Sequence, residues 1–308
     1  MTVASSLLAQ AYPSKPVRMI VGFAPGGGTD VTARLIVQPL SEALGQRVVI
    51  DNRPGANGVL ATEVTARAPA DGYTLLMVNL GHTVNPGLYQ KLPYDTVRDF
   101  AAVSLVVMLT NLLVVHPSLP VKSVAEFVRL AQVRPGTINY GSGGHGASSH
   151  LAVALFAKTA NIDLVHVAYK SGGLSAVALL SGEVAASFNS IPSTLSYVQS
   201  GRLRAIGVSS PKRSMGVPDV PTIAEMGYPG FSASGISGLV APAGTPAEVV
   251  DRIQAETARL LKRPGMVERL VALGMDPVGS TPAEFSRFIK IDMEKWTRLT
   301  RELKLALQ

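Results

Sequence analysis

The residues whose types and spacing suggest ligand binding lie in four glycine-rich turns, at residues 25–30, 52–58, 141–149 and 171–173. Each follows an apolar, β-branched run and precedes a helical pattern. The first backbone N–H groups of a helix have no partner inside it, and the helix dipole adds partial positive charge there. Such turns bind anions at one edge of an open α/β sheet. One turn alone is more often a tight connection, but four favour a shared site for an anionic ligand.

The segment Gly141-x-Gly143-x-x-Gly146 matches the dinucleotide-binding fingerprint, so an α/β enzyme or a nucleotide-binding protein is the alternative interpretation. That fingerprint also requires an acidic residue at the end of the next strand. Tyr169 and Lys170 stand at that end, and Asp163 lies before the strand. The sequence therefore favours a ligand other than a nucleotide.

Sequence signatures of enzymes and metal sites are missing. There is no Gly-Lys pair for a phosphate-binding P-loop, no Gly-x-Ser-x-Gly and no His-Glu-x-x-His. The chain contains no cysteine, which excludes disulfides, thiolate metal sites and a cysteine nucleophile. None of the five histidines pair at the helical spacing of metal ligands. We expect a protein that is not an enzyme, with no cofactor and no metal.

Four titratable residues bear on the site, and three of them allow two interpretations each. His82 and His145 follow predicted strands, in loops where they contact either a ligand or solvent. His166 alternates within the apolar run 164–168 and is expected in the core. Asp30 is expected to cap the first helix, because a carboxylate in the site would repel an acidic ligand.

The elements that position these turns alternate between strand and helix, which indicates an α/β fold with parallel strands. A serine or threonine precedes a glutamate by three residues four times, at Ser123, Thr222, Thr245 and Thr281, and this capping pattern predicts a helix start at each. Residues 101–116 are expected as buried strand, interrupted by Ser104, Thr110 and Asn111. The expected strands are 17–23, 47–51, 73–78, 111–116, 138–140, 164–168, 184–189, 203–209 and 238–241.

Composition limits the class of protein. The chain has 308 residues, 47% of them hydrophobic, with no uncharged apolar run long enough to span a membrane. This size fits one large or two medium domains. The net charge of +7 comes from scattered residues with few aromatics between them, which argues against nucleic-acid binding. Ala9-Gln10-Ala11 fits a signal-peptidase site, so residues 1–11 are expected to be the end of a secretory signal peptide.

Motifs in order along nearly the whole chain resemble the substrate-binding proteins of tripartite tricarboxylate transporters, the Bug family. The matching segments are 12–16 (YPSKP), 23–30 (FAPGGGTD), 51–56 (DNRPGA), 70–76 (ADGYTLL), 92–95 (LPYD), 149–151 (SHL), 165–167 (VHV), 169–170 (YK), 218–222 (PDVPT) and 239–246 (LVAPAGTP).

The resemblance implies a periplasmic, two-lobed clamshell of the type II-like class, each lobe a mostly parallel sheet flanked by helices. Lobe 1 would comprise residues 12–108 and 234–308, and lobe 2 residues 109–233. The ligand would be a dicarboxylate, a tricarboxylate or an aromatic acid, and the partner a membrane permease. We expect a monomer, and a ligand sensor for a signalling partner remains an alternative.

Carried over by position, the resemblance also implies a set of ligand-binding residues. They are Ala24, Gly27, Gly28, Thr29, Asn79, Gly81, His82, Ser142, Gly144, His145, Ser148, Tyr169, Asn189 and Ser190. Ile236 is a further candidate, because it begins a strand that would return between the lobes and border the ligand. The chain departs from the family at Ile236 and Ser237, where a tryptophan followed by an aromatic is common, and at His145, where a different polar residue is common. The room left at Ile236 leads to the hypothesis of a bulky or aromatic acid.

Overall fold

The computed structural model describes residues 12–25, 28–144, 147–169 and 171–303, which form two compact units. Unit 1 comprises Met1–Val106, Ser237–Leu261 and Gly279–Gln308, and unit 2 comprises Val107–Ile236 and Lys262–Val278. The expected lobe 1 included residues 262–278, which the structure assigns to unit 2. These residues include β11 (Met275–Pro277), which pairs with the unit-2 end of β4 (Phe100–Leu109). The predicted signal remnant, residues 1–11, lies outside the described residues.

Unit 1 is built on a mixed sheet of strand order β11-β4-β10-β3-β1-β2, in which β4 and β10 continue into unit 2. Strand β1 (Val17–Val21) runs parallel to β2 (Val48–Asn52) and to β3 (Thr74–Asn79). Strand β10 (Gly235–Pro242) runs antiparallel to β3. The apolar residues of β1 and β3 are buried, as expected for parallel strands covered on both faces.

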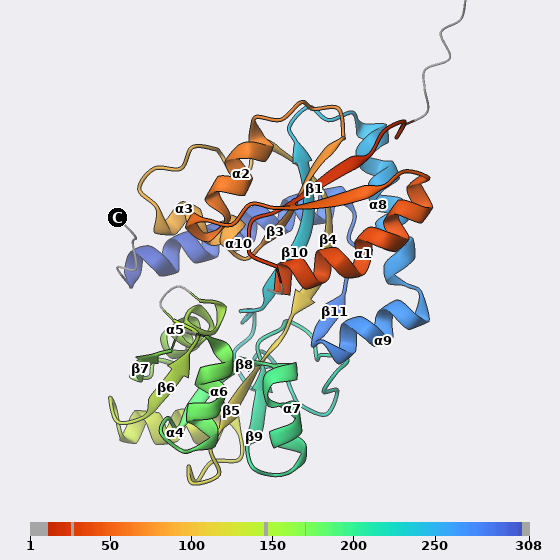
Figure 1. Cartoon of the computed structure of the whole chain (residues 1–308). Coiled ribbons are helices and arrows are strands. Elements are labelled where there is room, and N and C mark those ends of the chain that lie inside the picture. Colours follow the sequence, from red (N-terminus) through yellow and green to blue (C-terminus); the bar gives the residue numbers. More distant parts are fainter. Residues whose placement is uncertain (1–11, 26–27, 145–146, 170, 304–308) are drawn as a thin grey trace, which may run out of the picture. The chain divides into compact units, whose positions relative to one another are not determined.

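Helices cover the unit-1 sheet (Figure 1). They are α1 (Gly28–Leu44), the 3-10 turn η1 (Ala56–Gly58), α2 (Val59–Ala66), α3 (Gly81–Leu88), α8 (Ala247–Leu261) and α10 (Pro282–Glu302). Helix α1 packs against α8, and α3 packs along α10. The predicted capping box at Thr281 opens α10, with both reciprocal hydrogen bonds to Glu284 present.

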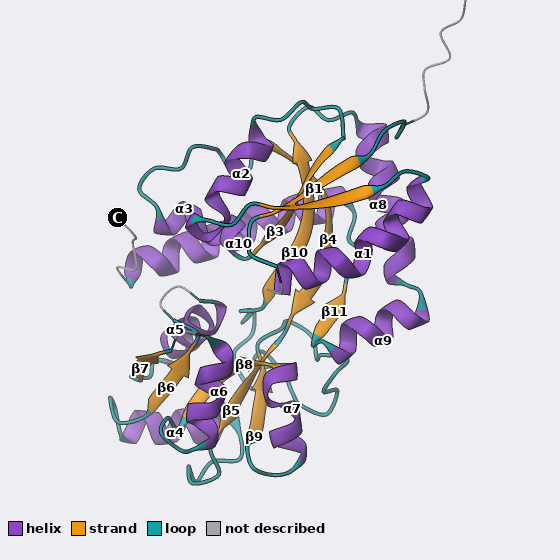
Figure 2. Ribbon diagram, viewed as in Figure 1, coloured by secondary structure: helices purple, strands orange, loops and turns teal. Residues whose placement is uncertain are grey.

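Unit 2 is built on a sheet of order β7-β6-β8-β5-β9 (Figure 2). The strands are β5 (Asn111–Val115), β6 (Asn139–Ser142), β7 (Val165–Ala168), β8 (Ala186–Ser190) and β9 (Arg204–Val208). Strand β6 is parallel to β7 and β8, whereas β5 is antiparallel to β8 and β9. The carboxyl ends of β6, β7 and β8 therefore lie at one edge of the sheet.

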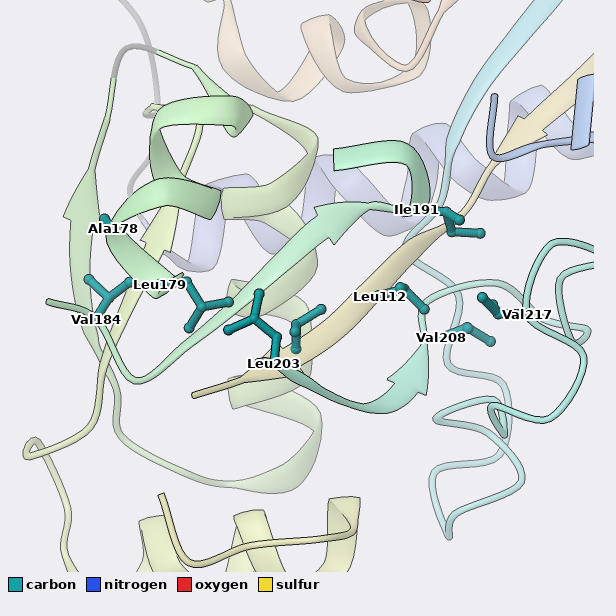
Figure 3. Close-up of a cluster of buried hydrophobic side chains, with 9 residues drawn as sticks. Leu112, Ala178, Leu179, Val184, Ile191, Leu203, Val208 and Val217 are labelled. Carbon is teal, nitrogen blue, oxygen red and sulfur yellow. The ribbon is translucent and has the colours of Figure 1, made fainter. Parts of the chain in front are cut away.

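The helices of unit 2 are α4 (Val124–Val133), α5 (Ser148–Ala160), α6 (Gly172–Leu180), α7 (Ile191–Gln199) and α9 (Pro264–Ala272). Figure 3 shows part of the apolar core beneath them, where Leu179 of α6 and Ile191 of α7 belong to the same cluster as Leu112 and Val208 of the sheet. This core fixes the start of α7 and the body of α6.

The buried strand expected over residues 101–116 is divided at Thr110, one of the interruptions that the sequence indicated, into β4 and β5. One expectation about the elements was wrong. The helix predicted after Thr222 is replaced by turns, although Glu225 N donates to Thr222 Oγ1 over 3.0 Å and Thr222 N donates to Glu225 Oε2 over 2.8 Å. Gly227 then takes a φ of +105°, so the capping pattern is present but the chain after it cannot continue as a helix.

The sheets are parallel only in part, since each combines three neighbouring parallel strands with antiparallel ones. No helix within the described residues is long and apolar enough to span a membrane.

Candidate functional site

The loops that follow β6 and β7 meet where the carboxyl ends of the parallel strands β6, β7 and β8 lie, which we call the parallel edge of the unit-2 sheet. A Cβ atom on Gly143 would lie 3.1 Å from the backbone nitrogen of Gly172, so the two loops touch through their main chains. Gly172 is the first residue of α6, and Ser171 caps this helix by accepting the Leu174 N–H over 3.3 Å. This edge therefore carries the N-terminus of α6, where backbone N–H groups have no partner within the helix.

Asn189, at the end of β8, lies next to the same helix terminus. Its side chain is buried, with 2% of the residue exposed, and neither Nδ2 nor Oδ1 has a hydrogen-bond partner among the described residues. A Cβ atom on Gly172 would lie 3.7 Å from Asn189 Oδ1, in ordinary contact. Leaving a buried amide unpaired costs about 1–3 kcal/mol, so this carboxamide lowers the free energy of unfolding of the chain.

Ser142, at the end of β6, is fully buried and holds the loop that follows. Its Oγ lies 2.6 Å from Nε2 of His166, accepts the Gly144 N–H over 3.1 Å and lies 3.2 Å from the Gly144 carbonyl oxygen. The His166 ring stacks on His150 of α5, with centroids 4.1 Å apart. The prediction that His166 is a satisfied residue fits this contact, although the ring is only half-buried.

Tyr169, the residue after β7, makes hydrogen bonds through both its backbone and its side chain. Its backbone N–H donates to the Ser142 carbonyl over 3.0 Å, and its hydroxyl donates to Glu183 over 2.8 Å. Burial and the Glu183 carboxylate raise the pKa of the Tyr169 hydroxyl to about 12. The hydroxyl is therefore protonated at neutral pH and engaged with Glu183.

In unit 1 the polar side chains near the ends of β1 and β2 bind one another. Asp30, in the first turn of α1, is fully buried and accepts Arg34 Nε over 2.7 Å and Asn52 Nδ2 over 2.9 Å. Asn57 and Asn85 form a second pair, in which Asn57 Nδ2 donates to Asn85 Oδ1 over 2.8 Å. Asp30 thus fixes the start of α1, in agreement with the interpretation that it holds the helix.

His82 lies in α3, so the prediction that it stands in a loop was wrong. It is buried edge-on against Phe100, with ring centroids 5.2 Å apart, and neither ring nitrogen has a hydrogen-bond partner among the described residues. Burial lowers the pKa of the imidazole to about 4, and an interaction with the Thr96 backbone offsets this only in part. The ring also borders a small cavity of about 10 Å³ beside Asn57 and Asn79, close to the volume of one water molecule.

The structure groups the predicted site residues by unit. In unit 1, Ala24, Gly28 and Thr29 lie between β1 and the first turn of α1, and Gly81 N–H donates to Asn79 Oδ1 over 2.9 Å at the start of α3. In unit 2, Ser142, Gly144, Ser148, Tyr169, Asn189 and Ser190 gather at the parallel edge.

Two further predicted residues, Gly27 and His145, lie outside the described residues. Ile236 is only 2% exposed in β10, next to Ser237, which pairs with Asn79 of β3. The sequence did not single out Gly172 individually, nor the contact between His150 and His166, because both depend on residues far apart in the chain.

Within the described residues, no three His, Cys, Asp or Glu side chains gather in a way that would hold a metal ion.

Comparisons with known proteins assign nearly the whole chain to one family. The model of the tripartite tricarboxylate transporter family receptor, TctC, matches residues 32–305. Protein BugT of Bordetella pertussis is 36% identical over 302 residues, covering 97% of this chain and 93% of BugT.

Two solved structures that carry ligands are also similar. R. palustris Rpa4515 with adipate is 33% identical with a TM-score of 0.76, covering 94% of this chain and 97% of that one. MatC from Rhodopseudomonas palustris with bound malate is 31% identical with a TM-score of 0.73, covering 94% and 99% of the two chains.

Proposed function

Because the chain belongs to the tripartite tricarboxylate transporter receptor family, we propose that it binds a small carboxylate in the periplasm and delivers it to a membrane permease. The observation that carries this proposal is the parallel edge of unit 2. There the N-terminus of α6 and the unpaired amide of Asn189 lie together, and both offer hydrogen bonds to an anion. The adipate and malate of the two similar structures support this class of ligand.

In unit 2 the proposed ligand contacts are Ser142, Gly144, His145, Ser148, Tyr169, Asn189 and Ser190. In unit 1 they are Ala24, Gly27, Gly28, Thr29, Asn79, Gly81 and His82, with Ile236 of β10 as a further contact. For His82 the proposal requires the ring to leave its buried position. The preference for a bulky or aromatic acid, deduced from Ile236, stays a hypothesis that an Ile236→Trp variant tests by a selective loss of affinity for such acids.

Catalysis is not part of the proposal. Ser142 and His166 are close enough to resemble the nucleophile and base of a hydrolase, but Ser142 Oγ is fully buried and held by the Gly144 backbone. The family and the similar solved structures are substrate-binding proteins. Export by residues 1–11, a monomeric state and a choice between uptake and sensing belong to the proposal and rest on the family alone.

Thermal unfolding in the presence of candidate ligands tests the proposal. A ligand that binds only the folded chain, at 100 times its dissociation constant, adds about 2.7 kcal/mol of stability, which raises the Tm by a few degrees. We expect at least one acid among adipate, malate, citrate and benzoate to do so, and NAD and ATP to leave the Tm unchanged. A rise with NAD or ATP and none with any acid would contradict the proposal.

A further inference from the structure

The carboxamide of Asn189 is buried, and its two polar atoms have different hydrogen-bonding requirements. Its Nδ2 is a donor and its Oδ1 an acceptor, and neither has a partner among the described residues. The assignment of oxygen and nitrogen does not matter, since a rotated amide would present the same two requirements. A ligand that satisfies Asn189 must therefore offer both an acceptor and a donor.

A carboxylate alone meets only half of this requirement. An ionised carboxylate accepts hydrogen bonds and donates none, so it can pair with Nδ2 and with the N-terminal N–H groups of α6 but not with Oδ1. The ligand therefore needs a hydroxyl or an ammonium group close to its carboxylate.

Charge decides between the two donors. The amide lies against Gly172, the first residue of α6, where the helix dipole places partial positive charge. Neither α6 nor α7 has an acidic residue in its first turn that would offset this charge for a cation. A neutral hydroxyl is compatible with this position, whereas an ammonium group is repelled.

We propose that Asn189 and Gly172 form a subsite that selects ligands with a hydroxyl group next to a carboxylate. The hydroxyl donates to Asn189 Oδ1, and the adjacent carboxylate accepts from Asn189 Nδ2 and from the N-terminus of α6. This inference rests on the proposed function and makes its ligand class narrower, from small carboxylates to hydroxy acids.

Calorimetric titration with matched acids tests the subsite. Malate and succinate differ only in one hydroxyl, as do mandelate and phenylacetate, so the two pairs cover compact and bulky ligands. Aspartate, which has an ammonium group in place of the malate hydroxyl, tests the argument from charge. We expect the hydroxy acid of at least one pair to bind about 10- to 100-fold more tightly than its partner, and malate to bind more tightly than aspartate.

Two variants locate the effect. Asn189→Leu removes both hydrogen-bonding atoms at similar volume and should abolish the preference within the pair. Gly172→Ala places a methyl group 3.7 Å from Asn189 Oδ1, which the free protein accommodates but a ligand atom there does not, so affinity for the hydroxy acid should fall at least about 10-fold.

Gly265→Ala is the matched control. Gly265 also lies in the first turn of a unit-2 helix, and a Cβ atom there would meet nothing within 4 Å. This control should bind like the wild type, while circular dichroism confirms that all three variants fold.

Each outcome decides the question. Equal affinities within both pairs, tighter binding of the plain acids or of aspartate, or unchanged hydroxy-acid binding in both Gly172→Ala and Asn189→Leu would overturn the subsite while leaving carboxylate binding intact. If none of these acids binds the wild type, the subsite is rejected. The proposed function fails only if adipate, citrate and benzoate are also without effect on the Tm.

Discussion

Buried polar side chains near the ends of parallel strands differ between Asp30 and Asn85 of unit 1 and Asn189 of unit 2. In unit 1, the buried Asp30 binds Arg34 and Asn52, and the buried Asn85 binds Asn57. In unit 2, Asn189 is equally buried and has no partner among the described residues. Buried groups that are paired hold loops in shape, whereas a buried unpaired group lowers stability and is retained where a ligand completes it. Substitutions at Asp30 and Asn85 should therefore change stability, and those at Asn189 should change affinity.

The largest expected effect comes from His82 in unit 1. Its pKa is lowered to about 4 in the folded chain and is 6.5 when exposed, so the unfolded chain binds more protons between these values. Stability should be fully present above pH 6.5 and fall as the pH drops toward 4, by about 3 kcal/mol in total from this residue.

Urea unfolding of the wild type and of His82→Gln across this pH range measures the effect, with His116→Gln as the control. The wild type should lose stability relative to His82→Gln as the pH falls from 6.5 toward 4, and a difference between the two that does not vary with pH would refute the role given to His82.

The next effect concerns Asp30. Asp30→Ala removes the buried carboxylate that accepts hydrogen bonds from Arg34 and Asn52. We expect the free energy of unfolding to fall by about 2 kcal/mol. The loss stays this small because the Arg34 side chain is half-exposed and can bind water instead. Asp251→Ala, at an exposed position of α8, is the control and should cost less than about 0.5 kcal/mol. If both variants unfold at the same urea concentration, the paired cluster of unit 1 does not stabilise its loops.

A matched pair of substitutions tests the comparison itself. Asn85→Leu, in α3, should destabilise the chain by about 1–3 kcal/mol, because it removes both hydrogen bonds that the buried Asn85 side chain makes with Asn57. Asn189→Leu removes groups that are already unpaired and should leave stability unchanged or raise it by about 1 kcal/mol. The same loss of stability in both variants would contradict the distinction between Asn85 and Asn189.

Local sequence patterns predicted most of the fold. The capping box of Thr281 and Glu284 starts α10 because its hydrogen bonds involve only neighbouring residues. Helix α3 was not predicted, since Pro86 and Gly87 near its end are typical of a turn. A Cβ atom on Gly87 would lie within 3 Å of Thr297 and Thr300, so close packing on α10 requires this glycine. Because Gly87 and its contacts on α10 are far apart in the chain, no local sequence pattern indicates this packing.

The candidate site also has features that local sequence predicted and features that depend on distant residues. The glycine-rich turns and their position after parallel strands could be predicted, because they depend on local order and on the α/β pattern. That Gly172 lies against Asn189, and that His150 stacks on His166, depends on how β6, β7 and β8 pair. The burial of His82 depends on Phe100, which is also distant in the sequence.

Native mass spectrometry with a mixture of small acids and nucleotides tests carboxylate binding most directly. We predict one bound acid per folded chain in the presence of adipate, malate, citrate, benzoate, NAD and ATP, each at the same concentration. A chain that retains a nucleotide, or that retains none of the acids, would contradict the account.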